Sequence, residues 1–290
     1  NSIAEEGSSG NGGEIDIKAS SLTVQNTFGG GINTNSKGEG NAGKISITAN
    51  SLLIEEGAGF TSSTEGKSTG QGGEININAT DFVTLRKKAG ISSDTSGTGK
   101  AGKISITTNS LLVEESSGIN SIAKEGSSGN GGEIEINVDT GSLTIQNYAG
   151  INTSSSNAGN AGKISIRAQS LQLQNFAAIG SNTGEGSTGN GGEIIVTANS
   201  LVLENNGSLR VESTGTGNAG ILNITADKIW LDKQSQIIGS TTSGNGGDLI
   251  LNVGDLLLLR RGSNISATAG TAQQQGNGGS ITINSPNGFI

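Results

Sequence analysis

The carboxylates are the side chains here that could do acid–base chemistry, because the 290 residues include no His and no Cys. Two carboxylates that flank a glycosidic bond are the usual machinery of glycoside hydrolysis. Three adjacent acid pairs recur with the internal repeat, and a basic run, Arg86 to Lys88, lies between the last two. The pairs are Glu5 with Glu6, Glu55 with Glu56, and Glu114 with Glu115. Since an active site should interrupt a repeat at one place, we expect ion pairs between stacked strands and predict no catalytic residue.

A glycine-rich tetrad, Gly-x-Gly/Ala-Gly, recurs ten times and raises two other kinds of site. The copy "GNGGD" at residues 244 to 248 is similar to the calcium repeats of secreted toxins, but those carry an Asp in nearly every copy at a period of about nine. A phosphate-binding loop needs Gly-Lys-Ser/Thr and a helix after it, and no copy has them. We therefore predict no metal, no cofactor and no structural role for calcium.

The structural interpretation of the tetrad is a tight corner, at which glycine supplies a positive φ. The second tetrad position is Asn in eight copies, with Gln71 and Lys100 as the departures. Stacked at one point of every repeat, these side chains are expected to form an amide ladder. The ladder residues are Asn11, Asn41, Asn130, Asn160, Asn190, Asn218, Asn245 and Asn277.

The residue after the tetrad alternates in charge through seven copies. The alternating residues are Glu14, Lys44, Glu74, Lys103, Glu133, Lys163 and Glu193. If one repeat makes one turn of a coil, these residues stand above one another at about 4.8 Å, and opposite neighbours attract. We expect this charge ladder to set the register of the coils, because a slip would place Glu on Glu and Lys on Lys.

The elements that position these ladders are short strands. The tetrads begin at Gly10 and recur to Gly276, so 266 residues divided by nine intervals gives a mean repeat of about 30. Each repeat shows period-two alternation in three segments, "EIDIKA", "LTVQN" and "INT" in the first copy. No segment has the period of an amphipathic helix. The sequence predicts an all-β, right-handed parallel β-helix of about ten coils, with three short strands per coil, as a single domain over residues 1–290.

The composition excludes several classes of function. A formal net charge of −8 argues against a nucleic-acid binder, which needs a basic face. The densest apolar run, "DLLLLRRG" at residues 255 to 262, is far shorter than the roughly 18 residues of a membrane span. The chain begins within a repeat, since "SIAEEGSSGNGG" closely matches residues 121–132, so we expect a segment of a longer fibre.

The pattern G-N-A-G-x-I-x-I-x-A, followed by a leucine strand and a Gly/Ala step into Ile, resembles the repeat regions of filamentous-haemagglutinin-like proteins. It is most similar to the shaft of large two-partner-secretion exoproteins of the cyanobacterial type. The resemblance covers nearly the whole chain. It implies a secreted or cell-surface β-helical shaft that acts in adhesion, in a surface layer or in filament formation. Such a shaft continues into further repeats or associates end to end, and a surface glycan or receptor is a possible partner.

Two other hypotheses stay open. One is a β-helical carbohydrate-active enzyme or glycan-binding module, for which Tyr148, Phe176 and Trp230 could stack on sugars unless they belong to the core or its flanks. The other is an ice-binding face, which would need a regular outward Thr column. Thr48, Thr107 and Thr197 recur, but other residue types interrupt that column.

Overall fold

The molecule is a parallel β-solenoid in which each repeat forms one coil. A computed structural model of the chain describes residues 1–26, 30–66, 68–138, 140–270 and 276–290. The described residues contain no helix and form two parallel sheets. Nine turns of roughly 30 residues are complete, and β21 (Ser280–Asn284) begins the next one.

The larger sheet has 12 strands and the smaller sheet has nine among the described residues. The other strands of the larger sheet are β1 (Glu14–Gln25), β3 (Lys44–Glu55), β5 (Glu74–Leu85), β7 (Lys103–Thr108), β8 (Leu111–Val113), β10 (Glu133–Val138), β11 (Ser142–Gln146), β13 (Lys163–Gln174), β15 (Glu193–Glu204), β17 (Ile221–Asp232) and β19 (Asp248–Leu259). The smaller sheet contains β2 (Gly31–Asn33), β4 (Gly59–Thr61), β6 (Gly90–Ser92), β9 (Gly118–Asn120), β12 (Gly150–Asn152), β14 (Ala178–Gly180), β16 (Ser208–Arg210), β18 (Gln236–Ile238) and β20 (Asn264–Ser266).

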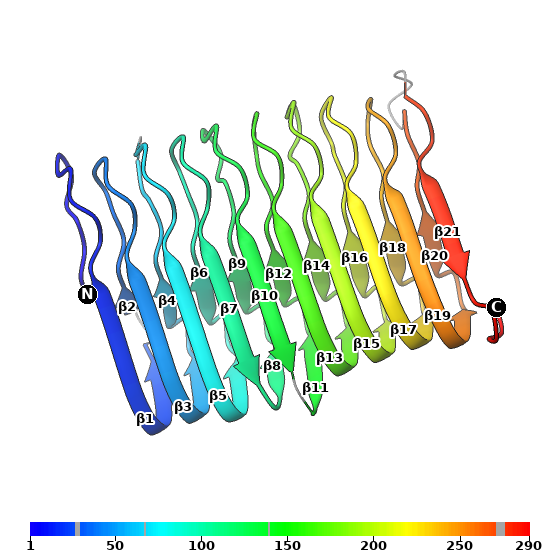
Figure 1. Cartoon of the computed structure of the whole chain (residues 1–290), viewed down its shortest axis with the longest axis horizontal. Helices are drawn as coiled ribbons and strands as arrows, with labels where there is room; N and C mark the ends of the chain where they lie inside the picture. The colour runs from blue at the N-terminus through cyan, green and yellow to red at the C-terminus, as the bar shows by residue number, and fades with distance from the viewer. Residues whose placement is uncertain (27–29, 67, 139, 271–275) are drawn as a thin grey trace.

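The coil is right-handed. In Figure 1 the near strands run downward, the chain returns upward behind them, and each turn advances from the N-terminal end on the left toward the C-terminus on the right. This handedness agrees with the strong preference of parallel crossover connections.

Two of the three expected strand segments are joined in most coils. In the second coil, here called coil 2, β3 continues through a corner. Asn50 and Ser51 both face outward at this corner, so the inward–outward alternation of side chains is interrupted there. Two later coils keep separate strands, β7 with β8 and β10 with β11. In the second of these coils the step from Val138 to Ser142 is two residues longer than the equivalent step from Ala168 to Ser170.

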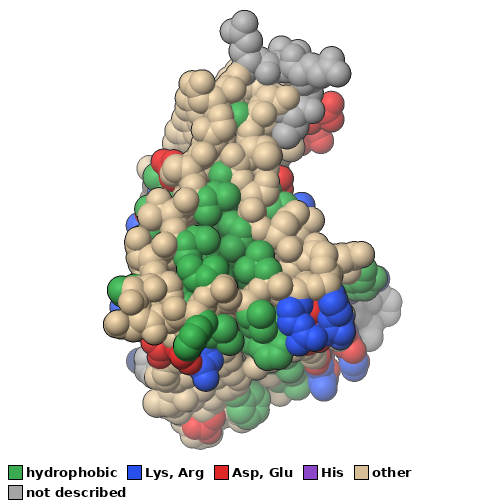
Figure 2. Space-filling view, turned by 90° about the vertical axis from the view of Figure 1, so that its right-hand side faces the viewer, with side chains coloured by type: hydrophobic (Ala, Val, Ile, Leu, Met, Phe, Trp, Pro, Cys, Tyr) green, Lys and Arg blue, Asp and Glu red, His purple; other side chains and the backbone are tan. Residues whose placement is uncertain are grey.

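The core is a narrow column of aliphatic side chains along the axis. In coil 2, Ile45, Leu52, Ile54 and Phe60 are fully buried, and their equivalents lie directly above them in register. The end coils cover less of their apolar surface, since Ile17, Ile32, Ile265 and Ile283 are only partly buried. Figure 2 shows hydrophobic side chains over the centre of the end that carries the C-terminus. Each coil therefore buries its apolar face against its neighbours.

Candidate functional site: the polar ladders and the groove between them

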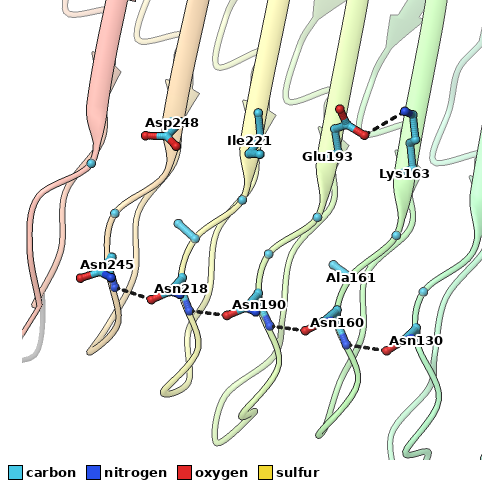
Figure 3. A pocket seen from close by; sticks show the side chains of 18 of the residues that line it. Asn130, Asn160, Ala161, Lys163, Asn190, Glu193, Asn218, Ile221, Asn245 and Asp248 are labelled. Carbon is cyan, nitrogen blue, oxygen red and sulfur yellow. Dashed lines mark hydrogen bonds and ion pairs between the residues drawn. The ribbon is translucent and has the colours of Figure 1, made fainter.

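The tetrads form a shallow groove along one side of the rod. Its longer part, about 1010 Å³, extends from the Lys100 coil to Ser280, and a second part of about 590 Å³ lies over the first coils. Glycine and alanine form the floor. In Figure 3 the Asn side chains lie along one side of the groove and the charged side chains lie along the other.

The charge ladder stands in one parallel register. In the strand register Glu14 lies beside Lys44 and Lys44 lies beside Glu74, and the same step repeats to Lys163 and Glu193. Ile221, Asp248 and Ser280 then occupy the column.

The ion pairs of this ladder are one-sided. Each lysine contacts the glutamate of the following coil, and the Nζ···O distances are 3.9 Å for Lys44–Glu74, 3.5 Å for Lys103–Glu133 and 2.9 Å for Lys163–Glu193. Among the described residues, no lysine of the column is within 4.0 Å of the preceding glutamate. Lys103 also contacts Glu135 at 3.1 Å, and that hydrogen bond raises the pKa of the Lys103 amine. The column therefore consists mostly of separate pairs, and not of residues with two close partners each.

The asparagine ladder is joined by side chain to backbone. Asn11 Oδ1 accepts a hydrogen bond from the backbone N–H of Asn41 at 2.8 Å, and Asn41 Oδ1 accepts one from Gln71. The same bond joins Asn130, Asn160, Asn190, Asn218, Asn245 and Asn277 in sequence, at 2.8–3.2 Å. In these bonds the acceptors are side-chain amide oxygens and the donors are backbone N–H groups. The ladder is interrupted at Lys100, whose side chain has no acceptor.

The prediction that the tetrad glycines supply positive φ is wrong. The described glycines with positive φ all lie outside the tetrads. A tetrad glycine instead permits close approach: a Cβ on Gly73 would stand 2.0 Å from Gly43 O and 2.1 Å from Ser62 Oγ. The backbone N–H of Gly73 also donates to Ser62 O at 2.8 Å. Only glycine fits where the two sides of the coil meet.

Buried hydroxyl groups complete this contact across the coil. Ser62, Ser93, Ser121 and Ser181 are fully buried, and each donates to the carbonyl of a tetrad glycine at 2.7–2.8 Å. We did not predict these braces from the sequence. The signal was present, because a Ser or Thr follows the third-strand apolar residue by two positions in the first six coils, and a period of two places both side chains inward.

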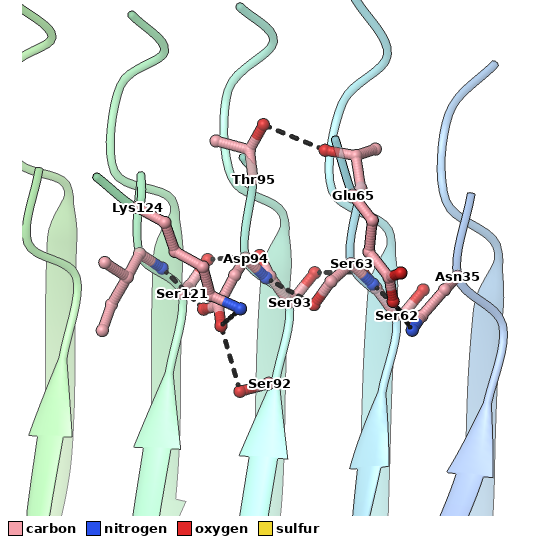
Figure 4. A network of polar contacts seen from close by, with 12 residues as sticks. Asn35, Ser62, Ser63, Glu65, Ser92, Ser93, Asp94, Thr95, Ser121 and Lys124 are labelled. Carbon is pink, nitrogen blue, oxygen red and sulfur yellow. Dashed lines mark hydrogen bonds and ion pairs between the residues drawn. The ribbon is translucent and has the colours of Figure 1, made fainter. Parts of the chain in front are cut away.

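A further polar column lies beside these hydroxyls and was also not predicted. Each bond in this column runs from a backbone N–H to the side chain of the preceding coil. Asn35 Oδ1 accepts from the N–H of Ser63, Ser63 Oγ accepts from the N–H of Asp94, and Asp94 Oδ1 accepts from the N–H of Ile122, at 2.9–3.0 Å (Figure 4). The Asp94 side chain is only 5% exposed and forms an ion pair with Lys124 at 3.1 Å. The buried carboxylate is thus both paired and hydrogen-bonded, as burial requires.

Two of the three acid pairs lie in the turn that follows the larger sheet, and Glu55 and Glu56 have cations of the next coil as partners. Glu55 contacts Arg86 at 2.8 Å and Glu56 contacts Lys87 at 3.3 Å. Hydrogen bonds from Gln25 and then Arg86 hold the pKa of the Glu55 carboxyl below its usual range. Glu114 instead accepts a hydrogen bond from Gln146 at 2.8 Å.

The remaining acid pair is not equivalent to these two. Glu5 and Glu6 lie in a different loop, beyond the smaller sheet, where Glu5 contacts Lys37 at 3.1 Å. The interpretation that all three pairs recur with the repeat is therefore wrong, because the repeat positions of Glu5 and Glu55 differ. Asp232 repeats the Glu55 arrangement, since Arg261 Nε donates to Asp232 Oδ1 at 2.7 Å and lowers the pKa of that carboxyl to about 2.

Within the described ranges, no three His, Cys, Asp or Glu side chains gather as a metal ion would require. The same part of the chain has no helix with the length and apolar character to cross a membrane. Compared with protein-family models, with curated proteins and with solved structures, the chain matches none of them.

Proposed function

We propose that this chain is the shaft of a secreted or cell-surface fibrous protein, and that it acts as a rigid spacer in adhesion, in a surface layer or in a filament. The observation that carries the proposal is the parallel register, which continues from β1 to β21 with aliphatic residues aligned in the same core columns. A spacer needs this uniformity, because every coil adds the same length.

The polar chemistry supports a mechanical role over a catalytic one. The acids that first suggested catalysis are used in contacts between coils, as Glu55 with Arg86 and Asp94 with Lys124 illustrate. A catalytic carboxylate pair needs free access to a substrate between its two groups. The partner favoured by the partly covered end coils is another coil of the same kind, either from a continuing chain or from a second copy.

The test is whether function follows the number of coils. The chain is placed between a membrane anchor and an antibody tag, and the membrane carries a polymer brush about as high as the native rod. Deletion of residues 44–102 joins Gly43 to Lys103 and keeps the charge alternation; it should shorten the rod by about 10 Å, at ~4.8 Å per coil. Antibody capture should fall in this deletion and rise when residues 44–102 are duplicated.

A matched control replaces residues 44–102 with a copy of residues 103–162, which also contains two coils and begins with Lys. Capture should be unchanged, because a spacer depends on length and not on which coils supply it. Capture that is independent of coil number would overturn the proposal. Release of reducing ends from a glycan panel, abolished by changes in a single coil, would favour the carbohydrate-active alternative.

A further inference from the structure

The turn after the larger sheet carries an exposed pair of aromatic rings. Tyr148 and Phe176 come from adjacent coils, and their side chains are stacked with centroids 5.0 Å apart and planes 1° from parallel. They are 67% and 51% exposed, so neither belongs to the core. Rings left in water forgo the gain from burial, and this makes the pair a candidate for a binding surface.

The backbone beneath the rings is strained. Each of these turns places two consecutive residues at positive φ, and Tyr148 and Phe176 both have φ of 64°. The equivalent residue of the next coil is Asn206, a type that tolerates this conformation. Lys88 and Gln234 have the same conformation in their own turns, so the turn does not require an aromatic side chain at this position.

Phe176 also borders a shallow depression of about 670 Å³. Asn206, Ser208, Arg210 and Gln236 line it as well. The next residue of the Phe176 column is Asn206, whose side chain is shorter than an aromatic ring, and half of the Phe176 surface is exposed. The depression thus combines an apolar ring surface with amide, hydroxyl and guanidinium groups.

The polar groups of the depression hold one another in place. Arg210 donates from Nε to Ser208 Oγ at 3.1 Å and from Nη2 to Gln236 Oε1 at 3.3 Å. Its Nη1 contacts the Glu212 carboxylate at 3.4 Å, which offsets the positive charge. The site is therefore polar and preorganised but close to neutral, and the chain as a whole has a net charge of −8.

We propose that this depression binds a neutral pyranose unit of a glycan chain. A pyranose has an apolar C–H face, which suits the free surface of the Phe176 ring, and a rim of hydroxyls, which suits paired amide and guanidinium donors. The offset charge of Arg210 and the acidic chain disfavour a uronate. This site goes beyond the spacer role, and it would give the shaft a lateral contact with a polysaccharide.

The test is titration of the intact chain with four sugars: neutral gluco-hexaoses linked β-1,4 and β-1,3, a mannohexaose, and hexagalacturonate. Calorimetry measures the affinity, and NMR of labelled Phe rings reports where the sugar binds. At least one neutral hexaose should bind and shift the Phe176 signals. Phe176→Asn copies the next coil and relieves the backbone, so it should fold, and it should weaken binding about tenfold, or about 1.4 kcal/mol. Phe82→Ser is the matched control: Phe82 is also exposed, at 45%, and replacing it should leave binding unchanged.

Three results would overturn the assignment. One is the absence of binding by every neutral hexaose at roughly 10 mM, a concentration that would reveal even a site with a Kd of about 1 mM. Another is equal binding by the Phe176→Asn variant. The third is tighter binding of hexagalacturonate than of the neutral sugars, which would contradict the neutral ligand. The brush experiment above contains no glycan, so failure here leaves the spacer proposal untouched.

Discussion

Gly73 and Glu74 are neighbours in the chain and recur with the same period, yet they meet opposite surroundings. A Cβ on Gly73 would stand 2.0 Å from the backbone of the preceding coil. The Glu74 side chain is 46% exposed, and its contact with Lys44 is 3.9 Å long. The comparison teaches that regular recurrence does not measure energetic weight. A backbone contact cannot yield, whereas a surface ion pair contributes only about 0–1 kcal/mol.

Substitution of the glycine should give the largest loss of stability. Gly73→Ala should destabilise the fold by about 3 kcal/mol or more, because the new methyl group meets backbone that belongs to the preceding coil. Chemical denaturation followed by circular dichroism measures the change in the free energy of unfolding. Gly90→Ala is the control, since a Cβ there meets nothing within 4 Å, and its effect should be within about 1 kcal/mol. Equal losses in the two variants would contradict the close-approach explanation.

The buried hydroxyls give the next largest effect. Ser93→Ala removes the donor to Gly73 O at 2.7 Å and should lower the free energy of unfolding by about 1–3 kcal/mol. Ser36 is the contrast, because its hydroxyl is fully buried and has no hydrogen-bond partner among the described residues. Ser36→Ala should therefore be neutral or slightly stabilising in the same denaturation assay. A loss at Ser36 as large as that at Ser93 would show that the brace is not the cause.

The turn ion pairs make a smaller contribution that depends on pH. The pKa of Asp232 is about 2 in the folded chain and about 3.9 for an unperturbed Asp. The folded state therefore binds fewer protons, so this contribution is complete above about pH 4 and is lost as the pH falls to about 2. Asp232→Asn should lower Tm at pH 7, and the difference from the parent chain should narrow over that window. A difference in Tm that stays constant with pH would argue against the ion pair as its source.

The charge ladder should give the smallest effect per pair. Lys44→Glu, Lys103→Glu and Lys163→Glu together should lower the free energy of unfolding at low salt. Adding Glu→Lys at positions 14, 74, 133 and 193 should restore much of it, because the sevenfold swap brings back opposite neighbours. Each pair contributes a few tenths to about 1 kcal/mol, and ~1 M salt should shrink all the differences. A swap no more stable than the triple variant would mean that the column is not a paired ladder.

The fold was predictable because its signal is repeated. Period-two alternation at Ile45 and Ile47 recurs in every coil, and the structure confirms the parallel β-helix and its repeat length. We did not predict that two of the expected strand segments join into one strand, β3. Two consecutive outward-facing residues at its corner look in the sequence like the end of a strand. The reason for the glycines was also missed. Close approach to Gly43 O depends on the neighbouring coil, and a sequence alone does not give that distance.

The functional residues were less predictable. The Glu and Lys of the charge ladder share a column, but the position of each Nζ depends on side-chain rotamers that the spacing does not specify. Tyr148 and Phe176 are separated by 28 residues, and only the register of the turns brings their rings together. Turn residues at positive φ were not anticipated, since Lys87 and Lys88 are not types that favour that conformation.

The central claim is that one repeat makes one rung of a straight, rigid rod. The chain has no native Cys, so spin labels can be placed at Asp16→Cys and Ser165→Cys, which the register separates by five rungs through Ser46, Asn76, Ser105 and Glu135. Double electron–electron resonance should give one narrow distance distribution centred near 24 Å, five times the ~4.8 Å strand spacing. A broad distribution, or a mean distance well above this value, would contradict the account.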